Sequence, residues 1–265
     1  MRREGLLQFL DIERHERGIA RVVMKHEASN NAMGEDLRGA LLPALTELLN
    51  DPRTRVIILA SALKNFSVGG DLSKMDTLAN PVHGRERIVS AHRLARLLLN
   101  ADKPLIAEIR GHAVGAGAGL ALTCDTIVMG ETASMGFPFP RIGLTPDFAI
   151  AYTLPRRIGL AKARQALLYA RSFKGPEALT IGLADDVVPD DDAAATAMER
   201  ARQIAALPSL ALALTKRMME RSDDPAAVLD FEAMAQPLCF ASEDFREGLA
   251  AFREKRKPHF GPAGE

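Results

Sequence analysis

The amino-acid sequence predicts an α/β fold with a parallel sheet, followed by a C-terminal lobe of helices. Up to about residue 188, short apolar runs typical of strands alternate with segments whose apolar residues recur at helical spacing. From Asp192 onward only the helical spacing remains. Two of the apolar runs also lead into turns of small residues, which let a backbone approach a ligand closely. We therefore expect an α/β core over residues 1–205 and a helical lobe over residues 206–265.

Apolar runs and helix stop signals place the elements of the first half. The expected strands cover residues 7–12, 19–24, 56–60 and 105–109, and the expected helices cover residues 37–49 and 87–99. The first helix stops at Asn50-Asp51-Pro52, and the second stops before Pro104.

The second half begins with a short apolar helix that ends at Cys124. The expected strands that follow cover residues 126–129 and 186–188, with a largely helical segment over residues 152–169 between them. Pro155 is the expected position of any break in that segment. The tail is expected to form helices over residues 193–207, 210–221, 226–240 and 244–257.

Composition argues against several classes of function. At 265 residues the chain can bury a sizeable core, and its formal net charge of zero gives no electrostatic support for a nucleic-acid partner. No apolar span is long enough for a membrane helix, and residues 1–6 lack a secretory signal pattern, so we expect no membrane partner. Cys124 and Cys239 are expected as reduced core residues, which favours the cytoplasm. The histidines show no metal-ligand spacing, so we expect no metal.

The two small-residue turns are the most informative feature of the chain. The first turn, residues 66–71 (FSVGGD), follows the apolar strand at 56–60. The second turn, residues 111–119 (GHAVGAGAG), follows the strand at 105–109. Each turn can present a bare backbone N–H, and two such donors aimed at one point form an oxyanion hole. The turns therefore indicate chemistry on a thioester or another acyl carbonyl.

A dinucleotide-binding interpretation of the glycine run fits less well. Gly115 and Gly117 match the first two glycines of the G-x-G-x-x-G fingerprint, but Leu120 stands at the third position. The sequence has no G-K-[ST], which excludes a P-loop. The remaining structural explanation is close packing of a helix against a strand, which also requires small residues.

Taken together, these motifs resemble the crotonase (enoyl-CoA hydratase/isomerase) superfamily. The resemblance covers nearly the whole chain, in order, at residues 31–33 (NAM), 66–72, 111–117, 124–125, 143–147 (GLTPD), 154–159 and 244–257. It implies a spiral of ββα units with a C-terminal helical lobe. It also implies an acyl-CoA substrate, with coenzyme A as part of that substrate and no separate cofactor, and a homotrimer or dimer of trimers.

The resemblance further implies the residues of the site. The oxyanion donors would be the N–H groups of Gly70 and Ala116, the second of which also opens a short helix whose N-terminus adds partial positive charge. Contacts with coenzyme A would come from Ala28, Ser29, Asn30, Val68, Gly70, Asp71, Leu72, Phe252 and Lys255. Phe252 and Lys255 match positions that reach the coenzyme A of a neighbouring subunit. Many relatives have a basic residue where this chain has Ala28, so phosphate binding would depend on other groups.

The chain departs from the family at both glutamate positions of a hydratase. Gly119 stands at the position of the first glutamate, and Phe139 stands at the position of the second. Neither side chain can transfer a proton. The two-carboxylate hydration mechanism is therefore excluded for this chain.

Asp147 is the carboxylate that remains in the site motif. Its position matches the catalytic aspartate of the phenylacetate-pathway enoyl-CoA isomerase type and of dienoyl-CoA isomerases, and also the nucleophilic aspartate of aryl-CoA dehalogenases. One carboxylate is enough to remove a proton from one carbon and return it to another, which favours an isomerase. The structural alternative is a helix N-cap, since Asp147 follows Pro146 directly before an apolar helix.

Two other functions remain open at this point. One is hydration or hydrolysis with a nonstandard base, and the other is acyl-CoA binding without chemistry. A second carboxylate could also come from Asp76 or Glu86, in the segment 74–87 that we expect to be mobile.

Overall fold

The computed structural model describes residues 8–72, 80–220 and 222–260, and it has the predicted α/β architecture. Its main sheet contains β1 (Leu10–His15), β2 (Ile19–Met24), β3 (Val56–Ser61), β4 (Leu105–Ile109), β6 (Thr126–Gly130) and β9 (Asp186–Val188). The strand order is β1-β2-β3-β4-β6-β9. β1 and β2 form an antiparallel hairpin, and each other neighbouring pair is parallel.

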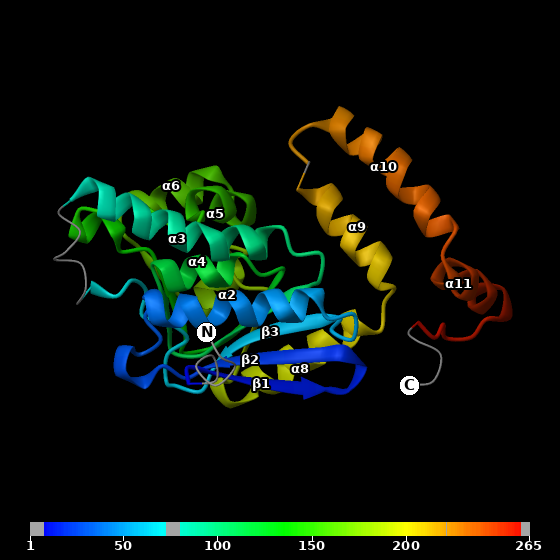
Figure 1. Ribbon diagram of the computed structural model, residues 1–265, viewed down its shortest axis with the longest axis horizontal. Helices are drawn as coiled ribbons and strands as arrows, with labels where there is room; N and C mark the ends of the chain where they lie inside the picture. Colours follow the sequence, from blue (N-terminus) through cyan, green and yellow to red (C-terminus); the bar gives the residue numbers. More distant parts are fainter. Residues whose placement is uncertain (1–7, 73–79, 221, 261–265) are drawn as a thin grey trace.

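Helices cover both faces of this sheet (Figure 1). They are α2 (Glu35–Asn50), α3 (Pro81–Leu99) and α4 (Ala116–Leu122) on one face and α8 (Ala193–Ala205) on the other. Alternate residues of a strand serve the two faces: Ile57 belongs to the large core under α2, α3 and α4, whereas Val56 packs with Ala201 of α8. Burial on both faces explains why the parallel strands read as continuous apolar runs in the sequence.

The structure also contains a second, smaller sheet. It consists of β5 (His112–Val114), β7 (Ser134–Gly136) and β8 (Ser172–Lys174), in the order β5-β7-β8. The sequence does not predict it, because strands of three residues are too short to show a period of two. The sheet is followed by α7 (Gly175–Thr180). Four 3₁₀ turns complete the described part of the core: η1 (Glu16–Gly18), η2 (Glu27–Ser29), η5 (Phe139–Ile142) and η6 (Asp190–Asp192).

Two predicted helix boundaries are wrong. α3 begins at Pro81 rather than at residue 87, because the Asn80 side chain accepts the Val82 N–H and Pro81 fits the first helical position. Residues 81–87, which we expected to be mobile, are therefore helical. The segment predicted over residues 152–169 consists of α5 (Ile150–Ile158) and α6 (Leu160–Leu168), and it breaks at Gly159, where φ is 78°, instead of at Pro155.

The C-terminal helices extend away from the core as an arm (Figure 1). The arm consists of α9 (Ser209–Met219), α10 (Pro225–Phe240) and α11 (Glu243–Glu254). Ion pairs of Lys216 with Asp125 and of Arg217 with Asp102 tie α9 to the core. α8, the last helix packed on the sheet, ends at Ala205, and the predicted domain boundary at residue 205 stays a prediction. Within the described ranges, no helix is both long and apolar enough to cross a membrane.

Candidate active site

The two small-residue turns lie side by side. The Ser67 N–H donates to the His112 carbonyl (3.0 Å), and the Val114 N–H donates to the Ser67 carbonyl (3.0 Å). A Cβ atom on Gly117 would lie only 2.6 Å from the Ser67 Cβ. α4 can therefore pack against the first turn because residue 117 carries no side chain.

Each turn bends at a glycine with positive φ. The angle is 95° at Gly69 and 52° at Gly115, in a region that other residues rarely adopt. The two glycines are neighbours, because a Cβ atom on Gly115 would lie 3.9 Å from the Gly69 Cα. The N–H groups that follow them belong to Gly70 and Ala116. Across residues 8–72, 80–220 and 222–260, neither of these two groups donates a hydrogen bond.

This arrangement can hold an anionic oxygen. Ala116 is the first residue of α4, and the first N–H groups of a helix have no partner within the helix. A carbonyl oxygen between the two turns would find two unused donors, which is the requirement for an oxyanion hole. The assignment of Gly70 and Ala116 to this role stays a prediction.

The segment predicted to contact coenzyme A is fixed to the first turn. The Ser67 hydroxyl donates to the Asn31 carbonyl (2.6 Å), and the Met33 N–H donates to the Gly69 carbonyl (2.6 Å). These bonds fix Asn31 and Met33 to the first turn. Ala28, Ser29 and Asn30 lie in and directly after η2, immediately before Asn31 in the chain.

The other predicted contacts with coenzyme A divide into two groups. Val68 and Asp71 belong to the first turn, and Leu72 directly follows it; Val68 and Leu72 are exposed, whereas Asp71 is half-buried. Phe252 is 82 % exposed on α11, and Lys255 ends that helix with φ at 54°. α11 belongs to the arm, away from α4 (Figure 1), so one chain does not bring these two residues to its own turns. Their predicted contact with a neighbouring subunit stays a prediction.

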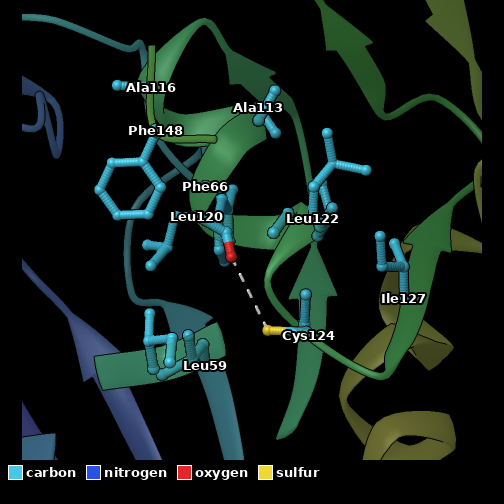
Figure 2. Packing of buried hydrophobic residues seen from close by; sticks show 14 of the residues in the cluster. Leu59, Phe66, Ala113, Ala116, Leu120, Leu122, Cys124, Ile127 and Phe148 are labelled. Atoms are coloured by element: carbon cyan, nitrogen blue, oxygen red, sulfur yellow. Dashed lines mark hydrogen bonds between the residues drawn. The ribbon is translucent and has the colours of Figure 1, made fainter. Parts of the chain in front are cut away.

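Aromatic packing surrounds Gly119 and involves Phe139, the two positions that the resemblance assigns to the glutamates of a hydratase. A Cβ atom on Gly119 would lie 2.6 Å from the Phe148 Cβ, and Phe148 is only 1 % exposed. Figure 2 shows the Phe148 ring against α4. The buried Phe139 ring lies on the opposite end of the glycine run, with a ring carbon 3.7 Å from the Cβ position of Gly115. The chain therefore lacks these carboxylates and also fills the space around Gly119.

Asp147 does not cap α5, so the capping alternative is wrong. The N-cap of α5 is Ala149, and no side chain accepts a hydrogen bond at that end of the helix. Only the Asp147 main-chain carbonyl takes part, accepting the Ile150 N–H at 3.0 Å. The Asp147 Oδ1 atom is buried and has no hydrogen-bond partner among the described residues. The carboxyl group is therefore left for another role.

The backbone directly after Asp147 is strained. Phe148 and Ala149 have φ values of 50° and 60°, which a bulky residue rarely adopts. Such conformations persist only where the surrounding structure imposes them, and they gather at functional sites. Here the strain turns the Phe148 ring towards Gly119 and sets where the Asp147 carboxyl lies.

Burial, a main-chain hydrogen bond and nearby side chains set the acidity of Asp147. Burial raises the pKa of the carboxyl group above its ordinary value, and a hydrogen bond from its own main chain and electrostatic interactions with Arg38, Arg87 and His92 oppose that rise in its pKa. A carboxyl group with a raised pKa is a stronger base than an exposed aspartate and can also give its proton back.

Sequence reasoning missed Arg38. A signal was present, since Arg38 falls on the apolar face of α2 next to Leu37 and three residues before Leu41, where a charge is unusual. The apolar residues dominate the periodicity of that helix, and Arg38 is the one charged side chain on its buried face.

The remaining candidates have different outcomes. Glu86 is exposed on α3, and Asp76 lies outside the described residues. His112 is hydrogen-bonded through Nδ1 to the Ser134 hydroxyl (2.7 Å). Asp125 has a structural role, since its carboxylate accepts the Leu105 N–H (2.7 Å).

Comparisons with known proteins show which family the chain resembles. Residues 14–263 match the family model described as enoyl-CoA hydratase/isomerase. The chain is 33 % identical to the short-chain-enoyl-CoA hydratase of Clostridium acetobutylicum, over 90 % of this chain and 92 % of the relative. It is 30 % identical to the 1,2-epoxyphenylacetyl-CoA isomerase of Escherichia coli, over 92 % and 95 % of the two chains. The crystal structure of an enoyl-CoA hydratase from Bacillus anthracis superposes with a TM-score of 0.90 at 28 % identity, covering 96 % and 99 %.

Proposed function

The chain belongs to the enoyl-CoA hydratase/isomerase family, and we propose that it is an isomerase that shifts a double bond in an enoyl-CoA thioester. One observation carries this proposal. Gly119 and Phe139 replace both glutamates of a hydratase, while the half-buried Asp147 keeps one carboxyl oxygen without a partner among the described residues. A single carboxylate beside an oxyanion hole suits proton transfer between two carbons of the same substrate.

The proposed reaction moves one proton. The ionised Asp147 carboxylate takes a proton from one carbon of the acyl chain, and the electron pair of that C–H bond moves towards the thioester oxygen. The N–H groups of Gly70 and Ala116 stabilise the resulting enolate. The protonated carboxyl group then returns the proton to a carbon further along the chain, and the double bond is left in its new position. The buried Phe139 and Phe148 rings support this reaction because they keep water away from the enolate.

The test is the Asp147→Asn variant, assayed for double-bond shift by the ultraviolet absorbance and NMR spectrum of the acyl group. We expect turnover to fall by about 10²–10⁴-fold, the usual contribution of a positioned proton-transfer group, while affinity for an acyl-CoA stays the same. Glu86→Gln is the matched control, since it removes an exposed carboxylate from α3. Full turnover in Asp147→Asn would refute the proposal.

Hydration is the second candidate, because the Clostridium acetobutylicum relative is named a hydratase. It would require a base other than the two missing glutamates. Turnover in water enriched in ¹⁸O separates the two reactions, because hydration puts solvent oxygen into the product and isomerisation does not. Tight acyl-CoA binding without turnover over a broad panel of enoyl-CoA substrates would instead indicate a binding protein.

The acyl-CoA contacts and the assembly are part of the same proposal. We propose that coenzyme A lies along residues 28–30 and the first turn, and that the chain forms a homotrimer or a dimer of trimers in the cytoplasm. The exposed large apolar side chains of the arm support an assembly: Leu229, Met234, Leu238, Phe240, Phe245, Leu249 and Phe252. Sedimentation equilibrium tests it, and a monomer at micromolar concentration would contradict it.

A further inference from the structure

Side chains from two helices act electrostatically on the Asp147 carboxyl group. Arg38 lies on α2, and Arg87 and His92 lie on α3, while Asp147 lies between η5 and α5. α2 and α3 pack against each other, so Arg38 and Arg87 lie on neighbouring helices although they are distant in the sequence. Glu35 and Arg87 act in turn on the charge of Arg38. Each of the two packed helices therefore contributes an arginine, Arg38 or Arg87, that acts electrostatically on Asp147.

Arg38 is held inside the protein by one strong hydrogen bond. The residue is 8 % exposed, and its Nη1 donates to the Met33 carbonyl at 2.6 Å. Met33 itself donates its N–H to the Gly69 carbonyl. The guanidinium group is thus linked through one residue to the turn that presents Gly70. This chain of bonds fixes a positive charge behind the first turn.

Two buried polar atoms of opposite character remain unused at this place. Arg38 Nε and Asp147 Oδ1 are both buried without hydrogen-bond partners in the part of the chain that the structure describes. A buried arginine is unfavourable unless a negative charge offsets it, and the same holds for a buried carboxylate. Each group therefore provides the charge that the other needs, but the two are not joined by a direct bond.

The missing bond matters for proton transfer. A carboxylate in a direct ion pair with arginine becomes a weak base, because the pair lowers its pKa by about 1–3 units. A guanidinium group that acts only through its charge offsets part of the effect of burial and leaves the Asp147 Oδ1 atom without a hydrogen-bond partner among the described residues. That oxygen can then accept a proton.

We propose that Arg38 is a positioning residue for Asp147: its guanidinium group, held in place by the Met33 carbonyl, provides a buried positive charge that favours the carboxylate form needed for proton transfer. The inference rests on the proposed isomerase function and adds to it a residue that does not touch the substrate. Arg87 and His92, which also act on Asp147, are expected to contribute less, because Arg38 has the largest effect of the three charges.

Two substitutions separate charge from structure. Arg38→Gln removes the charge but keeps an amide N–H₂ that can donate to the Met33 carbonyl, and Arg38→Lys keeps the charge. The Asp147 carboxyl carbon is followed by NMR over pH in protein labelled with ¹³C-aspartate, and Asp147→Asn identifies its resonance. Arg85→Gln is the matched control, since Arg85 is an exposed arginine on α3, two residues before Arg87.

In Arg38→Gln we expect the Asp147 carboxyl to titrate about one pH unit higher, at the low end of the effect of an opposite charge. The acid limb of kcat/KM should move by the same amount. In Arg38→Lys and Arg85→Gln both should stay near the wild-type position. If Arg38 only ties α2 to the first turn, Arg38→Gln leaves the titration unchanged, and this result would overturn the role of Arg38.

The experiment also separates failure of this inference from failure of the proposed function. Turnover lost in Asp147→Asn together with an unmoved carboxyl titration in Arg38→Gln refutes the role of Arg38 alone. Full turnover in Asp147→Asn refutes the isomerase mechanism, and with it any catalytic meaning of the pair, whatever the titration shows.

Discussion

The two sides of the candidate site differ sharply in chemistry. On the apolar side, the Phe148 ring packs against Gly119 and the Phe139 ring lies near Gly115. On the charged side, Asp147 interacts electrostatically with side chains of α2 and α3. Phe148 and Asp147 are neighbours in the chain, yet one fills the space at Gly119 and the other has a carboxyl oxygen without a partner among the described residues. Under the proposed isomerase function, proton transfer is confined to the charged side, which suits a proton shuttle better than the addition of water.

We expect the largest effect from removal of the Ala116 N–H, the proposed oxyanion donor at the start of α4. Ala116→Pro removes the Ala116 N–H, and proline is tolerated at the first position of a helix. We expect kcat to fall by about 10²–10³-fold, as for the loss of one oxyanion donor. Steady-state kinetics measure the loss, and a circular dichroism melt checks the fold. Unchanged kcat would remove Ala116 from the proposed hole.

The second test addresses the charged side through pH. Because burial raises the pKa of Asp147, the acid limb of kcat/KM should lie above the ordinary aspartate range. Turnover should fall about tenfold for each pH unit below that limb, since only the ionised form accepts a proton. A pH profile measured with saturating and limiting substrate tests this. A limb at the value of an exposed aspartate would mean that another group limits the reaction.

The third test adds a methyl group on the apolar side of the site, at Gly119. Gly119→Ala places a Cβ atom 2.6 Å from the Phe148 Cβ, so we expect a loss of about 1–3 kcal/mol in the free energy of unfolding, typical of overpacking. Urea denaturation measures it. Gly39→Ala is a matched control, because the space around the Gly39 Cβ position is open and Gly39 lies in a helix. An equal stability change in both variants would contradict tight packing between Gly119 and Phe148.

The smallest expected effect is a gain in stability on the charged side. A carboxyl group with a raised pKa in the folded state binds its proton more tightly there than in the unfolded chain. The free energy of unfolding therefore falls as pH rises through the interval between the two pKa values. Asp147→Asn should melt slightly higher than the wild type at neutral pH. The difference should disappear below the ordinary aspartate range, and a constant difference across pH would contradict the linkage.

Much of the fold could be predicted from local sequence patterns. Buried strands such as β3 and β4 are continuous apolar runs, because both faces of the sheet are covered. β5, β7 and β8 could not be found this way, since each has three residues and depends on pairing with the others. The start of α3 was predictable from Asn80-Pro81. The sequence offered both Pro155 and Gly159 as positions for a break, and the tertiary structure places the break between α5 and α6 at Gly159.

The sequence by itself determined the family, the two glycine turns and the lack of a proton-transferring side chain at Gly119 and Phe139, because these depend on residue identity and order. Only the tertiary structure decided that Asp147 does not cap α5, that Phe148 fills the space at Gly119, and that Arg38 provides a buried charge behind the first turn. The physical reason is that burial and electrostatic interaction arise between segments far apart in the chain. α2, α3 and the residues before α5 meet only after the sheet has brought them together.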